Sequence, residues 1–176
     1  MNKEALITTS KLLKLNFDTF LSNYDFLFLS EKLEKYYIEY IYIKGDLYIK
    51  FEINLYPQDF PYYFRIILGE GSLDFPESDW NSTALWRIGQ LNNPSSQAGY
   101  YTIEDIDDVK TLLKRALDDF ERVGKEFLCG NLETFIAARK NQNINREPYK
   151  MYSKDKNKKI QIEYDSNIIE LKSKYS

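Results

Sequence analysis

The amino-acid sequence predicts a single α+β domain, in which an antiparallel sheet of about four or five strands packs against an N-terminal helix and a long helix near residues 103–128. Two patterns indicate this fold class. Residues 36–43 and 47–56 are rich in strand-forming residues and are separated by one turn. Two other segments repeat apolar residues at spacings of three and four, which is typical of helices. A chain of 176 residues suits one domain. At this length folding buries roughly 70% of the unfolded chain's surface, so neither a disulfide nor a metal is needed for stability.

The first helix is expected over residues 3–21. Its apolar residues form one stripe and its lysines lie outside that stripe. The stripe consists of Leu6, Leu12, Leu13, Phe17, Phe20 and Leu21. The apolar run that follows, residues 26–29, is too short to distinguish a first strand from a helical turn.

The clearest local pattern is a β-hairpin. Residues 36–43 are β-branched and aromatic, residues 44–46 supply a turn, and residues 47–56 alternate between apolar and polar side chains. Such alternation predicts one face against the core and one face in solvent. After a proline-bounded turn, residues 62–68 are expected to form a third strand. We interpret the aromatic residues of this region as sheet packing rather than as a platform for stacking nucleic-acid bases.

The second half of the chain begins with a loop-rich stretch, residues 69–101, in which residues 83–88 form either a strand or a helical turn. A long helix is predicted over 103–128, because Thr102 is a good N-cap and ten apolar residues share one face. Gly130 is expected to end the helix.

Two parts of the chain differ in composition. Residues 1–140 are assigned to the α+β domain, including a short helix after Asn131, which is expected to act as its cap. Residues 141–176 form a polar, lysine-rich C-terminal extension. Its alternating segment, 160–164, either adds a strand to the edge of the sheet or belongs to a loosely ordered tail.

The absence of histidine excludes several catalytic classes. With no His and one cysteine, Cys129, the chain cannot form a Ser-His-Asp triad, a Cys-His pair or a histidine-containing zinc site. We therefore expect a protein that is not an enzyme. The alternative is a small carboxylate- or tyrosine-based enzyme, or a ligand-binding domain, of unknown substrate. Cys129 itself is expected to be a buried apolar residue near a helix end.

Composition also bounds the cellular setting. A single cysteine forbids an internal disulfide and fits a reducing compartment. No signal peptide and no apolar run of membrane-spanning length is found. A cytoplasmic location without a membrane partner is therefore expected.

Acidic residues dominate the middle of the chain. Residues 70–109 hold eight carboxylates against one cation, Arg87. Such a region repels nucleic acid and attracts a protein partner with a basic surface. Four of these carboxylates lie beside both tryptophans, and exposed tryptophans are favoured anchors at interfaces. The predicted partner-binding residues are Glu70, Asp74, Glu77, Asp79, Trp80 and Trp86.

Several other interpretations remain open for these residues. In one alternative, the two tryptophans close the end of the core, and the carboxylates serve only to keep the loop soluble. The acidic cluster at 104–108 is explained by its place in the first turn of the helix predicted at 103–128, where the helix dipole stabilises carboxylates. No calcium-loop spacing and no phosphate-binding glycine motif occurs, so neither a metal nor a cofactor is predicted. The lysine-rich stretch at 150–159 is interpreted as a solvated tail.

Residues 56–71 (YPQDFPYYFRIILGEG), the Trp80 and Trp86 pair, and residues 102–109 (TIEDIDDV) carry a resemblance. In these features the chain resembles small bacterial α+β domains, some of which are immunity proteins of polymorphic toxin systems. The resemblance covers residues 5–140 and supplies no catalytic residue. It implies the fold and a genomic setting beside toxins. Together with the acidic, tryptophan-bearing segment, it leads us to expect a non-catalytic protein-binding module, an immunity-type inhibitor that covers the basic active site of a toxin or nuclease with that surface.

Overall fold

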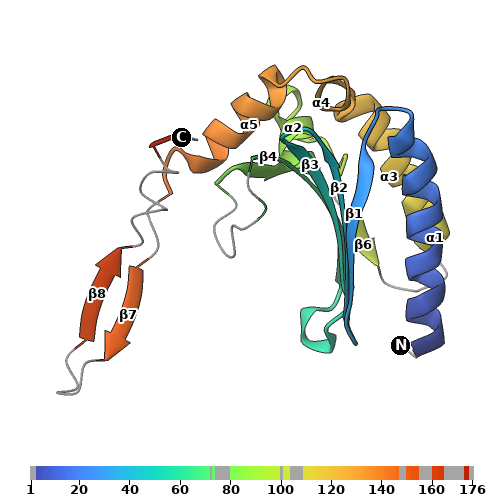
Figure 1. Ribbon diagram of the computed structural model, residues 1–176, viewed down its shortest axis with the longest axis horizontal. Helices are drawn as coiled ribbons and strands as arrows, with labels where there is room; N and C mark the ends of the chain where they lie inside the picture. Colours follow the sequence, from blue (N-terminus) through green and yellow to red (C-terminus); the bar gives the residue numbers. More distant parts are fainter. Residues whose placement is uncertain are drawn as a thin grey trace.

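The fold combines helices with one main antiparallel sheet, which confirms the α+β class (Figure 1). A computed structural model describes residues 3–71, 73, 80–99, 101–103, 109–146, 150–154, 160–164 and 173–174. Four long strands follow one another in chain order and pair with their neighbours: β1 (Leu27–Leu33), β2 (Tyr37–Lys44), β3 (Leu47–Asn54) and β4 (Tyr62–Glu70).

Two short strands complete the main sheet. β5 (Ser82–Ala84) pairs with the second half of β4, and β6 (Tyr101–Ile103) pairs with the first half. The described part of this sheet therefore has six strands, against the four or five that the sequence predicts. Because β5 and β6 share one edge of β4, they leave its residues 65 and 66 between them.

The predicted hairpin is confirmed in its position. β2 and β3 pair from Lys44 opposite Leu47 to Tyr37 opposite Asn54. Gly45 in the turn has a φ of 57°, which glycine adopts without steric cost.

One face of the sheet carries the main core. Helix α1 (Lys3–Ser22), expected from the sequence at 3–21, lies along this face together with α3 (Val109–Val123) (Figure 1). Phe51 of β3 is fully buried there, with its ring centroid 3.8 Å from that of Phe17. Aromatic burial of this kind contributes most of the stability of a small core.

The opposite face of the sheet is less exposed to solvent than the alternation in β3 predicts. Tyr48, Glu52 and Asn54 are all at most 9% exposed. The Tyr48 hydroxyl donates to Asn81 Oδ1 at 3.1 Å, and Glu52 lies between basic neighbours. Polar residues on this face are thus buried with hydrogen-bonding partners, which alternation alone does not reveal.

The prediction of one long helix at 103–128 is wrong at its start, and the observed helix is interrupted near its end. Thr102 and Ile103 belong to β6, because their backbone pairs with β4, and α3 begins at Val109. Residues 104–108 lie outside the described residues. At Gly124 the helix breaks and α4 (Lys125–Leu128) continues it to the expected end. A Cβ at Gly124 would lie 2.3 Å from the Phe120 ring, so this position requires glycine.

The segment after α4 agrees with the sequence except at the cap of the next helix and at Cys129. Gly130 has a φ of 86°, and α5 (Glu133–Asn143) follows as expected. Asn131 Oδ1 accepts a hydrogen bond from the Glu133 N–H at 3.1 Å, but the N-cap of α5 is Leu132, so the prediction of Asn131 as the cap is wrong by one position. Cys129 is exposed, because Phe127 and Leu128 supply the buried side chains of this turn, and the prediction of a buried cysteine is wrong.

The C-terminal extension contains a second, two-stranded sheet. β7 (Lys150–Lys154) pairs antiparallel with β8 (Ile160–Tyr164). A strand at 160–164 is confirmed, and its described partner is β7 rather than the edge of the main sheet. α5 extends to Asn143, so this helix crosses from the expected domain into the extension.

Candidate functional site

The gap between β5 and β6 creates a recessed surface beside β4. Helix α2 (Leu85–Asn92) begins directly after β5. Its first turn therefore brings Trp86 and Arg87 next to the part of β4 that neither short strand covers, where Arg65 lies.

Trp86 is the shared wall of three adjoining hollows. The first, of about 340 Å³, lies towards α5, and the second, of about 410 Å³, lies towards β6. The third, of about 360 Å³, lies between α2 and α5. The indole is partly buried, and the Arg87 guanidinium lies 4.4 Å from its ring centroid. We call Trp86 and the residues that border these hollows with it, Tyr63, Arg65, Arg87, Gln90 and Gln142, the Trp86 surface.

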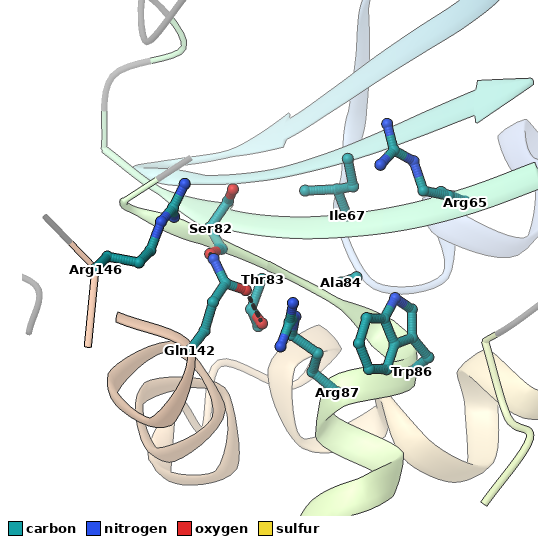
Figure 2. A pocket seen from close by; sticks show the side chains of 9 residues that line it. All are labelled: Arg65, Ile67, Ser82, Thr83, Ala84, Trp86, Arg87, Gln142 and Arg146. Carbon is teal, nitrogen blue, oxygen red and sulfur yellow. Dashed lines mark hydrogen bonds between the residues drawn. The ribbon is translucent and has the colours of Figure 1, made fainter. Parts of the chain in front are cut away.

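The first hollow collects positive charge. Three guanidinium groups border it, from Arg65 on β4, Arg87 on α2 and Arg146 after α5, and Figure 2 shows Arg87 between Gln142 and the Trp86 ring. We call it the arginine hollow. Arg65 pairs with Glu52 at 2.5 Å. The pKa of Arg87 is lowered from its usual value, first by partial desolvation and then by the positive charge of Arg146.

Neutral polar groups complete the arginine hollow. The Thr83 hydroxyl donates to Gln142 Oε1 at 3.0 Å, as the dashed line in Figure 2 marks. Gln142 Nε2 in turn donates to the Ser82 carbonyl at 3.4 Å. Ser82 and Thr83 are buried, so this side of the hollow is held in place by the contact between β5 and α5.

Glu70, a predicted contact residue, takes part in a structural ion pair. Its Oε2 accepts a hydrogen bond from Arg139 Nη1 at 2.8 Å, and Arg139 is 4% exposed. Since the guanidinium is buried, the carboxylate compensates its charge. Glu70 therefore stabilises the contact of β4 with α5.

Trp80 does not present an exposed ring. It is 1% exposed, and Arg146 lies 5.0 Å from its ring centroid. Asn143 Nδ2 donates to the Trp80 carbonyl at 2.9 Å, which ties this residue to the end of α5. For Trp80 the structure follows the alternative interpretation, in which a tryptophan closes the end of the core.

The remaining predicted contacts, Asp74, Glu77 and Asp79, lie outside the described residues. Of the predicted contact residues that the structure describes, Trp86 is the one that borders these three hollows. The sequence reasoning missed Arg65, Gln142 and Arg146. Arg65 and Arg146 are 81 positions apart, so only the paired strands and α5 bring them together.

A second polar cluster lies on the same sheet face. The Tyr37 hydroxyl is 2.8 Å from Glu39 Oε2 and 3.2 Å from Glu52 Oε1, and Lys50 Nζ lies 3.3 Å from Glu52. Burial and the two carboxylates raise the pKa of Tyr37 above its usual value, so the hydroxyl keeps its proton. These paired charges fit a stabilising network better than the acid and base of the enzyme alternative.

The described residues form neither a metal-binding cluster nor a membrane-spanning helix. Among the residues described, no three Asp, Glu or Cys side chains come close enough together to hold a metal ion. Within the described helices, none combines the length and apolar character needed to cross a membrane.

Comparison with models of known protein families, with curated protein sequences and with solved structures found no significant match to this chain.

Proposed function

We propose that the chain is a non-catalytic protein-binding module and that its partner docks on the Trp86 surface. The observation that carries this proposal is the position of Trp86, a partly buried indole that borders three adjoining hollows. Tryptophan and arginine are the residues that most often dominate binding energy at interfaces. Here Arg87 lies against the ring of Trp86 and holds it in place.

The rigidity of its support favours this surface as an interface. Trp86 is fixed at the start of α2, between two fully or nearly buried residues of the same helix, Leu85 and Ile88. A preorganised aromatic side chain loses little conformational entropy on binding. Recesses on several sides of one indole give a partner places to insert its own side chains.

The particular kind of module that we propose is an immunity-type inhibitor. This part of the proposal rests on the sequence resemblance and on the loop carboxylates Asp74, Glu77 and Asp79, which follow β4 in the chain. Those carboxylates would contact a basic partner. The arginines beside Trp86 would contact acidic groups at the rim of the same interface.

A pull-down from lysate of the native cells tests the proposal. Wild-type chain, Trp86→Ala and Leu15→Ala serve as baits, and captured proteins are identified by mass spectrometry. Leu15 is the matched control, because it is 67% exposed and lies on α1, outside the Trp86 surface. We expect one stoichiometric partner with wild type and Leu15→Ala and its loss with Trp86→Ala.

Two further results bear on the proposal. Equal capture by all three baits would contradict docking on the Trp86 surface. Replacing Asp74, Glu77 and Asp79 together by lysine should weaken capture and reduce its dependence on salt. Unchanged capture by that triple variant would contradict the basic partner and leave the docking on Trp86 standing.

A further inference from the structure

The arginine hollow has a chemistry of its own, which goes beyond a protein-binding role for the Trp86 surface. We propose that it binds the phosphate group of a small phosphate monoester. Three features of the hollow support this proposal: its charge balance, the start of α2 at its edge and its size.

The charge balance calls for a dianion. Glu52 compensates Arg65, which it contacts at 2.5 Å. Among the residues described, no carboxylate forms an ion pair with Arg87 or Arg146. Two guanidinium charges thus face one hollow, and a phosphate monoester carries close to two negative charges at neutral pH.

The repulsion between these two arginines supports the same conclusion. The positive charge of Arg146 is one cause of the lowered pKa of Arg87. A bound anion between them would replace this repulsion by attraction to both groups. Arginine is also suited to the task, because its planar fork donates two parallel hydrogen bonds to phosphate oxygens.

The start of α2 borders the hollow from a second direction. The Thr83 hydroxyl already donates to Gln142, and α2 begins directly after β5 at this point. No side chain caps the first turn of α2, and that turn contains no acidic residue. The positive end of the helix therefore adds to the field of the arginines.

The volume favours an organic ester over a bare anion. At about 340 Å³ the hollow falls at the small end of the range for ligand sites, roughly 300–1,000 Å³. Its wall includes the apolar side chain of Ile67 and the Trp86 ring. An ester can thus place its phosphate at the arginines and its carbon atoms against Trp86 and Ile67.

Isothermal titration calorimetry of the full chain tests this inference. The probes are inorganic phosphate, glycerol phosphate and a nucleoside 5′-monophosphate, with acetate as the singly charged comparison. The test variant is Arg87→Gln with Arg146→Gln. The control is Lys110→Gln with Lys125→Gln, which removes the same charge from exposed lysines outside the hollow.

We expect at least one monoester to bind more tightly than inorganic phosphate, and acetate to bind more weakly than both. The arginine variant should weaken monoester binding at least tenfold, and the lysine control less than twofold. Equal losses in the two double variants would mean general charge attraction and would overturn the inference. So would the absence of binding to wild type, or a monoester that binds no better than inorganic phosphate.

The pH dependence of binding to the wild-type chain gives a further test that needs no variant. The chain has no histidine, so no side chain with an ordinary pKa titrates between about pH 5.5 and 7.5, whereas the phosphate does. Binding to wild type should weaken at about pH 5.5 as the dianion gains a proton. Binding that does not change over this interval would contradict recognition of a dianion. These titrations need no protein partner, so their failure leaves docking on Trp86 untouched.

Discussion

Glu70 allows a sharp test between a structural role and a contact role. The substitution Glu70→Gln keeps the shape of the side chain and removes the charge that faces Arg139 at 2.8 Å. The guanidinium would then be buried opposite a neutral amide. We therefore expect the variant to be less stable than wild type, with the Trp86 surface intact.

The magnitude follows from the burial of the two partners. Removing one partner of a buried ion pair costs about 3–5 kcal/mol. Here the Arg139 side chain is 5% exposed but that of Glu70 is 33% exposed, and glutamine still offers an oxygen acceptor. We expect a loss of about 2 kcal/mol in the free energy of unfolding, because solvent screens the exposed side of the pair. For a chain of this length the loss lowers Tm by roughly 4–8 °C.

Urea unfolding followed by circular dichroism is the assay. Glu121→Gln, at an exposed position of α3, is the matched control and should change stability by less than about 0.5 kcal/mol. The double variant Glu70→Met with Arg139→Met should recover most of the loss, since apolar replacement of both charges removes the penalty. A Glu70→Gln variant as stable as wild type but unable to capture the partner would refute the structural role.

Three more predictions concern the core and its titrating groups. Phe51→Ala should cost about 3–5 kcal/mol in urea unfolding, because its ring is fully buried, whereas Leu15→Ala on the surface should cost far less. Gly69→Ala should lower Tm, because the added Cβ would lie 2.0 Å from the Tyr48 ring; an unchanged Tm would show that this ring moves aside freely. Burial and Asp119 raise the pKa of the Tyr101 hydroxyl, so the unfolded chain loses that proton first. The unfolding free energy should therefore fall as pH rises above about 10, and fall less in Tyr101→Phe.

Local sequence patterns predicted the elements that depend on local interactions. The hairpin of β2 and β3 has its own alternation and its own turn glycine, so its position could be predicted from adjacent residues. The same holds for α1, whose buried residues Leu13, Phe17 and Leu21 belong to the predicted apolar stripe. By contrast, β6 is only three residues long and exists because it pairs with β4, about forty positions earlier. The local sequence at Thr102 and Ile103 favours the start of a helix, but the pairing of these residues with β4 outweighs that preference.

The candidate site could be predicted only in part for the same reason. Trp86 was identifiable from its residue type and its neighbouring loop. Trp80 has the same residue type but is buried, and its carbonyl accepts a hydrogen bond from Asn143, a contact across 63 positions that no local pattern reveals. The positive character of the hollow was hidden as well, since Arg87 is a lone cation in an acidic stretch of the sequence. Its basic neighbours come from β4 and from the end of α5.

The central claim, that a partner covers the Trp86 surface, is tested most directly by hydrogen exchange of the chain with and without the purified partner. We predict slower exchange in the backbone amides of α2 and in residues 62–67 of β4, with no change in α1. Protection confined to α1 and β1, with α2 unaffected, would contradict the account.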